Sequence, residues 1–306
     1  MLKLFCDYMK KVGLVLEGGA MRGMYTAGVL DVFLDNNIKI DGIIGVSAGA
    51  IVGINYFSKQ RGRTIRYNKK YVKDKRYISF SSLIKTGNII NKDFAYYKIP
   101  FKLDKFDEKM YQKSKGDFYC TVTNVETGLA EYIKITNTKK QMEVIRATSA
   151  MPFLSKMIKI NNQMYLDGAL ADSIPIKKCM ELGFDKIIVV LTRPINYKKK
   201  KPIKFFGKII YRKYPNLVTS MNNRYLNYNK TLKFIEECEN KNEIIVIRPS
   251  VPIKIKRLEK NTDKLDEVYQ LGISDAKKNI KRIKNYIKKI SNPLITYLVT
   301  YLINLF

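Results

Sequence analysis

The feature that most constrains this chain is a G-x-S-x-G pattern placed directly after an apolar segment. The pattern is Gly45-Val46-Ser47-Ala48-Gly49, and it continues an apolar stretch that begins at residue 42. Between a strand and a helix, such a pattern is typical of a nucleophile elbow, a sharp turn that holds a serine hydroxyl in the open. We therefore expect a strand over 42–46, a helix over 48–57, and Ser47 exposed between them.

The absence of histidine limits how Ser47 can be activated, because none of the 306 residues is a histidine. A Ser-His-Asp triad needs an imidazole and cannot form. Either Ser47 is no nucleophile, or an Asp, Glu, Lys or Tyr accepts its proton. Asp167 is the candidate, since it follows a short predicted strand over 164–166 and precedes Gly168. The alternative role for this aspartate is a hydrogen bond to its own turn backbone.

A glycine-rich run lies between a predicted strand over 12–16 and a predicted helix over 25–34. It reads Gly18-Gly19-Ala20-Met21-Arg22-Gly23. Such a loop can aim several backbone N–H groups at one point, as an oxyanion hole requires, and Arg22 can steady the loop or add charge. A nucleotide-phosphate loop is the rival interpretation. It fails because the run lacks G-K-[ST] and has Ala20 where G-x-G-x-x-G needs a glycine.

The order of segments predicts an α/β fold with a mainly parallel central sheet flanked by helices. Residues 59–115 lose the regular pattern, and we expect them to form a basic, partly helical cap inserted into a catalytic domain over 11–180. Residues 181–306 should complete the sheet and end in a basic helical extension. Further strands are predicted over 118–123, 130–135, 186–191 and 243–247.

The net charge of +30 is unevenly distributed along the chain. Residues 59–115 hold 17 basic and 5 acidic residues, and residues 193–306 hold 26 and 9, whereas the segments with the motifs are nearly neutral. A general bias toward Lys, Ile, Asn and Tyr explains part of the charge. The uneven distribution favours a basic surface that faces membrane phosphates or nucleic acid. Nucleic acid is the less expected partner, because the chain has no recognisable motif for it.

The C-terminal segment suggests contact with a membrane. A helix predicted over 277–290 carries isoleucines on one side and seven basic residues around them, and residues 294–306 are mostly apolar. This pattern is typical of an interfacial membrane helix, and the alternative is a terminal helix packed on the core. We find neither an apolar stretch of roughly 18 residues nor a signal peptide. We therefore expect a cytoplasmic protein, peripheral at the inner face of the membrane. The isoleucines are Ile280, Ile283, Ile287 and Ile290.

Together, these motifs resemble those of the patatin-like phospholipase family. The resemblance lies in the run at 18–23, the pattern at 45–49 and Asp167-Gly168-Ala169, in matching order and spacing. Residues 146–152 also look like the family's segment before the last motif. The resemblance covers about residues 11–180 and implies a patatin-like α/β fold.

The resemblance also implies a function. It implies a serine acyl hydrolase of phospholipase A or lysophospholipase type, acting on lipid esters without metal or cofactor. Ser47 would be the nucleophile, Asp167 the base and the run from Gly18 to Gly23 the oxyanion hole. One departure is Ala20, where the family usually has glycine; alanine suffices unless this residue must be left-handed. The alternative is a catalytically silent adaptor that binds membrane or nucleic acid, against which the intact Ser47, Asp167 and Arg22 argue.

Overall fold

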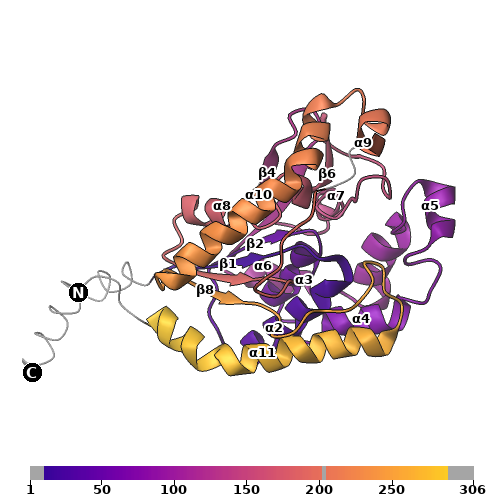
Figure 1. The fold of residues 1–306 in the computed structure, drawn as a ribbon. Helices are drawn as coiled ribbons and strands as arrows, with labels where there is room; N and C mark the ends of the chain where they lie inside the picture. The colour runs from indigo at the N-terminus through magenta and orange to yellow at the C-terminus, as the bar shows by residue number, and fades with distance from the viewer. Residues whose placement is uncertain (1–9, 202–204, 289–306) are drawn as a thin grey trace, which may run out of the picture.

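The computed structural model describes residues 10–201 and 205–288 (Figure 1). Its centre is an eight-stranded sheet in the order β5-β6-β3-β2-β1-β7-β8, with β4 paired to β3. The strands are β1 (Val12–Leu16), β2 (Gly42–Val46), β3 (Asp117–Asn124), β4 (Ala130–Lys134), β5 (Ile158–Ile160), β6 (Gln163–Asp167), β7 (Lys186–Val190) and β8 (Ile244–Ile247).

The sheet is parallel at its centre and antiparallel at one edge. Strands β3, β2, β1, β7 and β8 run parallel, whereas β4 and β6 pair antiparallel with β3, and β5 with β6. The carboxyl ends of β1 and β2 therefore meet at the same edge of the sheet, and ligands bind at such edges in α/β proteins. The predicted α/β fold with a mainly parallel central sheet is confirmed.

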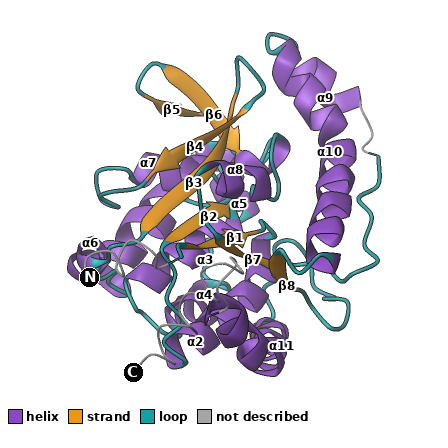
Figure 2. Ribbon diagram, turned by 90° about the vertical axis from the view of Figure 1, so that its left-hand side faces the viewer, coloured by secondary structure: helices purple, strands orange, loops and turns teal. Residues whose placement is uncertain are grey.

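Helices cover both faces of this sheet, because its central strands are apolar on both sides. Leu14 and Leu16 pack on one face with α2 (Gly23–Asp35), α3 (Ala48–Phe57) and α11 (Thr262–Lys288). Val15 and Val189 pack on the other face with α8 (Ile176–Glu181) and α10 (Pro215–Asn240). Figure 2 shows α2 and α11 on one side of the sheet and α10 on the other. The predicted helix over 48–57 is confirmed residue for residue.

Residues 59–115, the predicted cap, are largely helical and pack on α3. They contain α4 (Arg63–Tyr71), α5 (Phe80–Thr86), the π-helix η2 (Lys92–Leu103) and α6 (Glu108–Lys113). Tyr67, Phe94 and Ile99 bury their side chains in the same core as α3. π-Helices are rare and occur mostly as single-turn bulges, so a π-helix of this length is unusual. The remaining helices are η1 (Ala20–Arg22), α7 (Met142–Ala147), η3 (Gly168–Leu170) and α9 (Phe205–Ile210).

The interpretation of residues 277–288 as an interfacial membrane helix is wrong. They belong to α11, whose Ile283 is fully buried and whose Ile280 and Ile287 pack against the main core beside α2. Their apolar side is therefore used for folding, as the alternative interpretation expected. Ile290 and the predicted apolar end over 294–306 lie outside the described residues. None of the described helices is long and apolar enough to cross a membrane.

Candidate active site

Ser47 occupies a strained turn between β2 and α3. Its φ of 53° and ψ of −123° lie where L-residues are seldom found, as expected for a nucleophile elbow. Glycine at position 49 permits the turn, because an added Cβ would lie 2.4 Å from the carbonyl oxygen of Leu16. Gly45 has a similar role, with Ala50 Cα 2.5 Å from its added Cβ. Ser47 is only 8% exposed and lines a cavity, so its hydroxyl does not lie in the open.

Asp167 lies at the end of β6, within hydrogen-bonding distance of Ser47. The Ser47 hydroxyl donates to Asp167 Oδ2 at 2.8 Å, and the Ala169 N–H donates to Asp167 Oδ1 at 2.9 Å. Asp167 therefore accepts a hydrogen bond from Ser47 on one oxygen and one from its own turn backbone on the other. The residue after Asp167 has no room for a side chain, because an added Cβ at Gly168 would lie 2.1 Å from the carbonyl oxygen of Thr121.

The surroundings of Asp167 favour proton uptake. Asp167 is 6% exposed, and its burial raises the pKa of its carboxyl above the usual value. The positive charge of Arg224 opposes this rise most, followed by the hydrogen bonds from the Ala169 N–H and the Ser47 hydroxyl. A buried carboxylate is a stronger base than an exposed one, and it stays charged only while such donors stabilise it.

The glycine-rich run passes directly beside Ser47. Gly18 is so close that an added Cβ would lie 3.1 Å from Ser47 Cβ. Among the described residues, the backbone N–H groups of Gly18, Gly19 and Ala20 have no hydrogen-bond acceptor. These residues line the cavity that contains Ser47 and Asp167, as Arg22 and Ala169 do. Gly23 does not line it, since it begins α2 and packs against Ala48.

Comparison with known proteins shows to which family this chain belongs. The model of the family described as "Patatin-like phospholipase" matches residues 14–180. This chain belongs to the patatin-like phospholipase family. A second family model, "Domain of unknown function (DUF6363)", matches residues 214–288.

Several relatives share most of the length of this patatin-like chain. "Uncharacterized protein YjjU" of Escherichia coli is 27% identical, with 86% of this chain and 75% of that protein covered. "Lysophospholipase nte1" of Aspergillus niger is 26% identical over 90% of this chain, which spans only 18% of that protein. Among solved structures, VipD from Legionella pneumophila has 10% identity and a TM-score of 0.43, covering 90% of this chain and 67% of VipD. That structural likeness is too distant to support an argument.

Ala20 adopts the conformation in which the family's usual glycine would be unstrained. Its φ is +50°, so this residue is left-handed. The left-handed region costs a residue with a Cβ about 1–2 kcal/mol. This patatin-like protein thus keeps the loop conformation and the N–H group of residue 20 at the expense of local strain.

Thr148 is a site residue that sequence reasoning did not single out, although it lies in the family-like segment 146–152. Its hydroxyl oxygen accepts the Ser47 N–H at 2.9 Å and donates to the carbonyl oxygen of Thr121 at 2.6 Å. This bridge joins the strained turn to β3. Thr148 therefore helps to hold Ser47 in its unusual backbone conformation.

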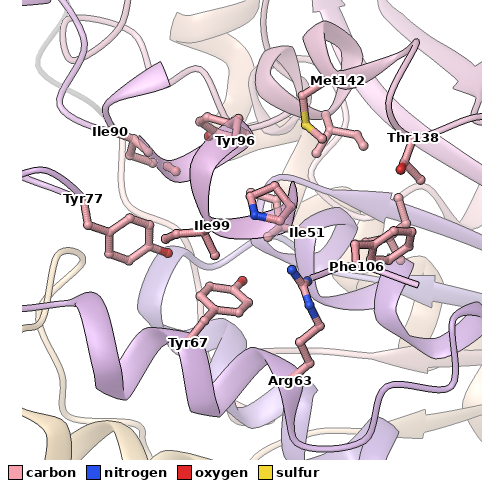
Figure 3. Close-up of a pocket in the computed structure, with 14 residues that line it drawn as sticks. Ile51, Arg63, Tyr67, Tyr77, Ile90, Tyr96, Ile99, Phe106, Thr138 and Met142 are labelled. Carbon is pink, nitrogen blue, oxygen red and sulfur yellow. The ribbon is translucent and has the colours of Figure 1, made fainter. Parts of the chain in front are cut away.

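An apolar pocket, formed by two adjoining cavities, extends from Ser47 beneath residues 59–115. The cavity next to Ser47 measures about 80 Å³, and the second measures about 100 Å³. Both are lined by Ile51 of α3 and by three residues of the cap. Figure 3 shows side chains of the cap and of α3 gathered around the second cavity. The shared cap residues are Tyr67, Tyr77 and Ile90.

A cavity of different character lies beside Ser47 and Asp167. It measures about 140 Å³, and its lining includes five basic side chains but only two carboxylates, those of Glu17 and Asp167. We call it the cationic cavity. Most of these basic residues lie outside residues 14–180, so the family's motifs do not include them. They are Arg22, Arg193, Lys199, Arg224 and Arg257.

Proposed function

We propose that this protein hydrolyses the carboxylic ester of a phospholipid or lysophospholipid, with Ser47 as nucleophile and Asp167 as general base. The observation that carries the proposal is the 2.8 Å hydrogen bond from the Ser47 hydroxyl to Asp167, formed between two residues that line the same cavity. Membership of the patatin-like phospholipase family and the similarity to proteins named lysophospholipases support a lipid substrate.

The proposed reaction has two steps. First, Ser47 Oγ attacks the ester carbonyl carbon while its proton passes to Asp167 Oδ2, and the alcohol leaves with that proton. Next, Asp167 takes a proton from water, which attacks the acyl-enzyme, releases the fatty acid and restores the Ser47 hydroxyl. In both steps, the N–H groups of residues 18–20 donate to the carbonyl oxygen as negative charge develops on it.

A serine-reactive fluorophosphonate probe tests the nucleophile. We expect the probe to label the wild-type protein and the control variant Ser81→Ala, whose altered serine is exposed on α5. Ser47→Ala should remain unlabelled and lose hydrolysis of a p-nitrophenyl ester. Equal labelling of Ser47→Ala and wild type contradicts the proposal. No labelling and no esterase activity in the wild type favours the binding-only adaptor instead.

We also propose that the protein contacts anionic membranes peripherally, through α5. This helix exposes Phe80 and Ile84 by 71% and 86%, on one side because they are four residues apart. Basic residues precede it at Lys73, Lys75 and Arg76. Tyr77 and Ile90, on either side of α5, line the apolar pocket. Figure 1 shows α5 at the edge of the molecule, away from the sheet.

Co-sedimentation with phosphatidylglycerol vesicles tests this contact. The double variant Phe80→Ser/Ile84→Ser should bind several-fold more weakly than wild type, because it lacks the two exposed apolar side chains that the lipid would bury. Leu226→Ser, which removes an exposed apolar side chain of α10, is the matched control and should bind as wild type does. Equal binding of the double variant and wild type contradicts a contact through α5.

A further inference from the structure

We infer that the cationic cavity binds the phosphate of an anionic lipid ester, and that the region after residue 190 supplies most of this headgroup site. The inference deepens the proposed hydrolase function, on which its placement beside the reacting ester rests. The basic residues come from separate parts of the chain. Arg22 belongs to η1, Arg193 and Lys199 follow β7, Arg224 lies on α10, and Arg257 precedes α11.

The positive charges in this cavity are not neutralised by neighbouring carboxylates. Among the described residues, none of the five basic side chains forms a salt bridge. Arg22 Nε is buried without a hydrogen-bond partner, and Arg224 Nε has only a 3.4 Å hydrogen bond to Ser173 Oγ. Elsewhere in the same chain, buried Arg63 pairs with Asp104. Unlike Arg63, four of these five basic residues are only partly buried, and Arg257 is exposed, so an incoming anion can reach them.

Glu17 does not offset this charge by direct pairing, because neutral groups occupy its carboxylate. One oxygen accepts the Tyr228 hydroxyl at 2.7 Å, and the other accepts the Thr192 N–H at 2.6 Å and the Thr192 hydroxyl at 3.1 Å. Asp167 is similarly engaged by Ser47 and Ala169. The guanidinium groups therefore retain donors for an incoming anion.

Repulsion among these cations gives the cavity an affinity for negative charge. Burial and then Arg193 lower the pKa of Arg22, and burial and Arg257 lower that of Arg224. Burial lowers the pKa of Lys199 to about 7, and Arg224, Arg193 and Arg22 contribute to this shift. An anion that enters the cavity relieves this repulsion. A phosphate group suits these donors, because its three acceptor oxygens can engage more than one guanidinium group, each of which binds oxygens in pairs at fixed geometry.

The position of the cavity indicates that this phosphate belongs to the lipid being hydrolysed. The cationic cavity and the apolar pocket share Ala20, Ser47, Met151 and Arg257 as lining residues. A lipid whose ester lies at Ser47 can therefore place its acyl chain on one side and its headgroup on the other. A choline headgroup is disfavoured, because its ammonium would enter the same positive field. The expected substrates carry a net negative headgroup, as lysophosphatidic acid does.

This assignment gives a role to a region whose matching family model is described as having unknown function. Arg224 and Arg257 lie within residues 214–288, which that model covers. Arg193 and Lys199 lie between the two matched regions. The family's own motifs thus contribute Ser47, Asp167 and the glycine-rich run with Arg22, while the following region contributes the other four charges proposed to select the headgroup.

The inference can be tested by measuring the hydrolysis of three lipids that each carry the same single acyl chain and differ in their headgroup. The wild type should prefer lysophosphatidic acid over monoacylglycerol and over lysophosphatidylcholine by tenfold or more in kcat/KM. Arg224→Gln and Arg193→Gln should each reduce that preference at least fivefold, because each removes a cation from the cavity. Arg212→Gln, which alters an exposed arginine, is the matched control and should retain it. A uniform decline on all three substrates, or an unchanged preference in both variants, overturns the inference.

Binding to the Ser47→Ala protein separates this inference from the proposed function. An ether analogue, 1-O-alkylglycerol 3-phosphate, should bind at least tenfold more tightly than 1-O-alkylglycerol, and Arg224→Gln should remove most of the difference. If this difference holds while the wild type hydrolyses no ester, the headgroup site stands and the hydrolase proposal fails. Inorganic phosphate that binds as tightly as the ether phosphate overturns the assignment to a lipid headgroup. Equal binding of the two ether lipids does the same.

Discussion

The two spaces that meet at Ser47 differ in their chemistry and in their origin along the chain. The apolar pocket is lined mainly by α3, the helical residues 59–115 and residues 138–151, and next to Ser47 also by Met21, Met24 and Leu258. The cationic cavity takes Arg193, Arg224 and Arg257 from the region after the matched patatin-like domain. Ser47 lines both spaces. Under the proposed function, we therefore expect acyl-chain and headgroup selection to depend on largely separate segments, which substitutions can distinguish.

The two spaces should also discriminate between substrates in different ways. Each methylene buried in an apolar pocket contributes about 0.8 kcal/mol, so chain length is selected gradually. A charge acts over a longer distance in a poorly solvated cavity, so one charged headgroup is strongly distinguished from a neutral one. Changes at Ser47 or Asp167 should lower the hydrolysis of all substrates. Changes in either space should instead alter the rate for one substrate relative to another.

The largest expected effect is that of Asp167→Asn. Removal of the base should lower kcat at least a thousandfold for charged and neutral substrates alike, because Ser47 then has no proton acceptor at 2.8 Å. Adding Ser47→Ala should cause little further loss, since the two residues act as a unit. Steady-state kinetics checks both, with Asp266→Asn, a change in an exposed ion pair, as control. Substantial activity in Asp167→Asn shows that another group is the base.

The wild-type activity should also depend on the protonation of Asp167. Burial raises the pKa of this carboxyl, and only its deprotonated form can accept the Ser47 proton. Activity should therefore rise with pH as the proton is lost and fall as pH decreases through that raised pKa. A pH–kcat profile measures the ascending limb. A profile that falls with increasing pH over this range would require a catalytic acid instead.

A smaller effect, confined to acyl-chain selection, is expected from Ile90→Phe. This residue lines both cavities of the apolar pocket, so a larger ring should obstruct the path of a long chain. The ratio of kcat/KM for a sixteen-carbon ester over a four-carbon ester should decline by about tenfold to a hundredfold. Leu226→Phe, on the exposed side of α10, is the control. An unchanged ratio in Ile90→Phe means that the chain does not enter this pocket.

A few-fold effect is expected from the titration of Lys199. Its pKa of about 7 results from burial and from Arg224, Arg193 and Arg22, against the opposing charge of Glu17. Below pH 7 it is protonated and adds a cation for the headgroup; above pH 7 this cation is lost. The KM for lysophosphatidylglycerol, whose phosphodiester keeps one charge over this range, should therefore rise between pH 6 and pH 8 by about fivefold, which corresponds to about 1 kcal/mol.

Two variants distinguish this titration from other pH effects. In Lys199→Gln the rise in KM should vanish, whereas in Lys200→Gln, which alters the exposed neighbouring lysine, it should persist. Monoacylglycerol should show no such rise in the wild type, because it has no charge to interact with Lys199. A rise that persists in Lys199→Gln assigns the titration to another group.

Sequence alone could predict the parts of this molecule that are encoded locally. The strands over 12–16 and 42–46 are short apolar runs, and glycines lie on both sides of Ser47, so these features are visible without tertiary contacts. The cationic cavity was not predictable in this way. Arg193, Arg224 and Arg257 stand among 26 basic residues in 193–306, and nothing in their neighbourhood distinguishes those that fold toward Ser47.

The helix over 277–288 shows a second limit of sequence reasoning. An amphipathic pattern records that one side of a helix is buried, but not whether lipid or protein buries it. Here the buried side faces α2, and Ile283 is fully enclosed. Positive charge around such a helix is therefore compatible with an ordinary core contact.

The smallest expected effect concerns Ala20, which lines both spaces and has a φ of +50°. Ala20→Gly should relieve the left-handed strain of about 1–2 kcal/mol, and the greater freedom of glycine in the unfolded chain should offset part of this gain. We expect the free energy of unfolding to increase by about 0.5–1 kcal/mol, measured by chemical denaturation. Ala27→Gly, in the interior of α2, should instead decrease it by about 1 kcal/mol. If Ala20→Gly destabilises the protein as Ala27→Gly does, the loop carries no such strain, and the alanine at this position needs another explanation.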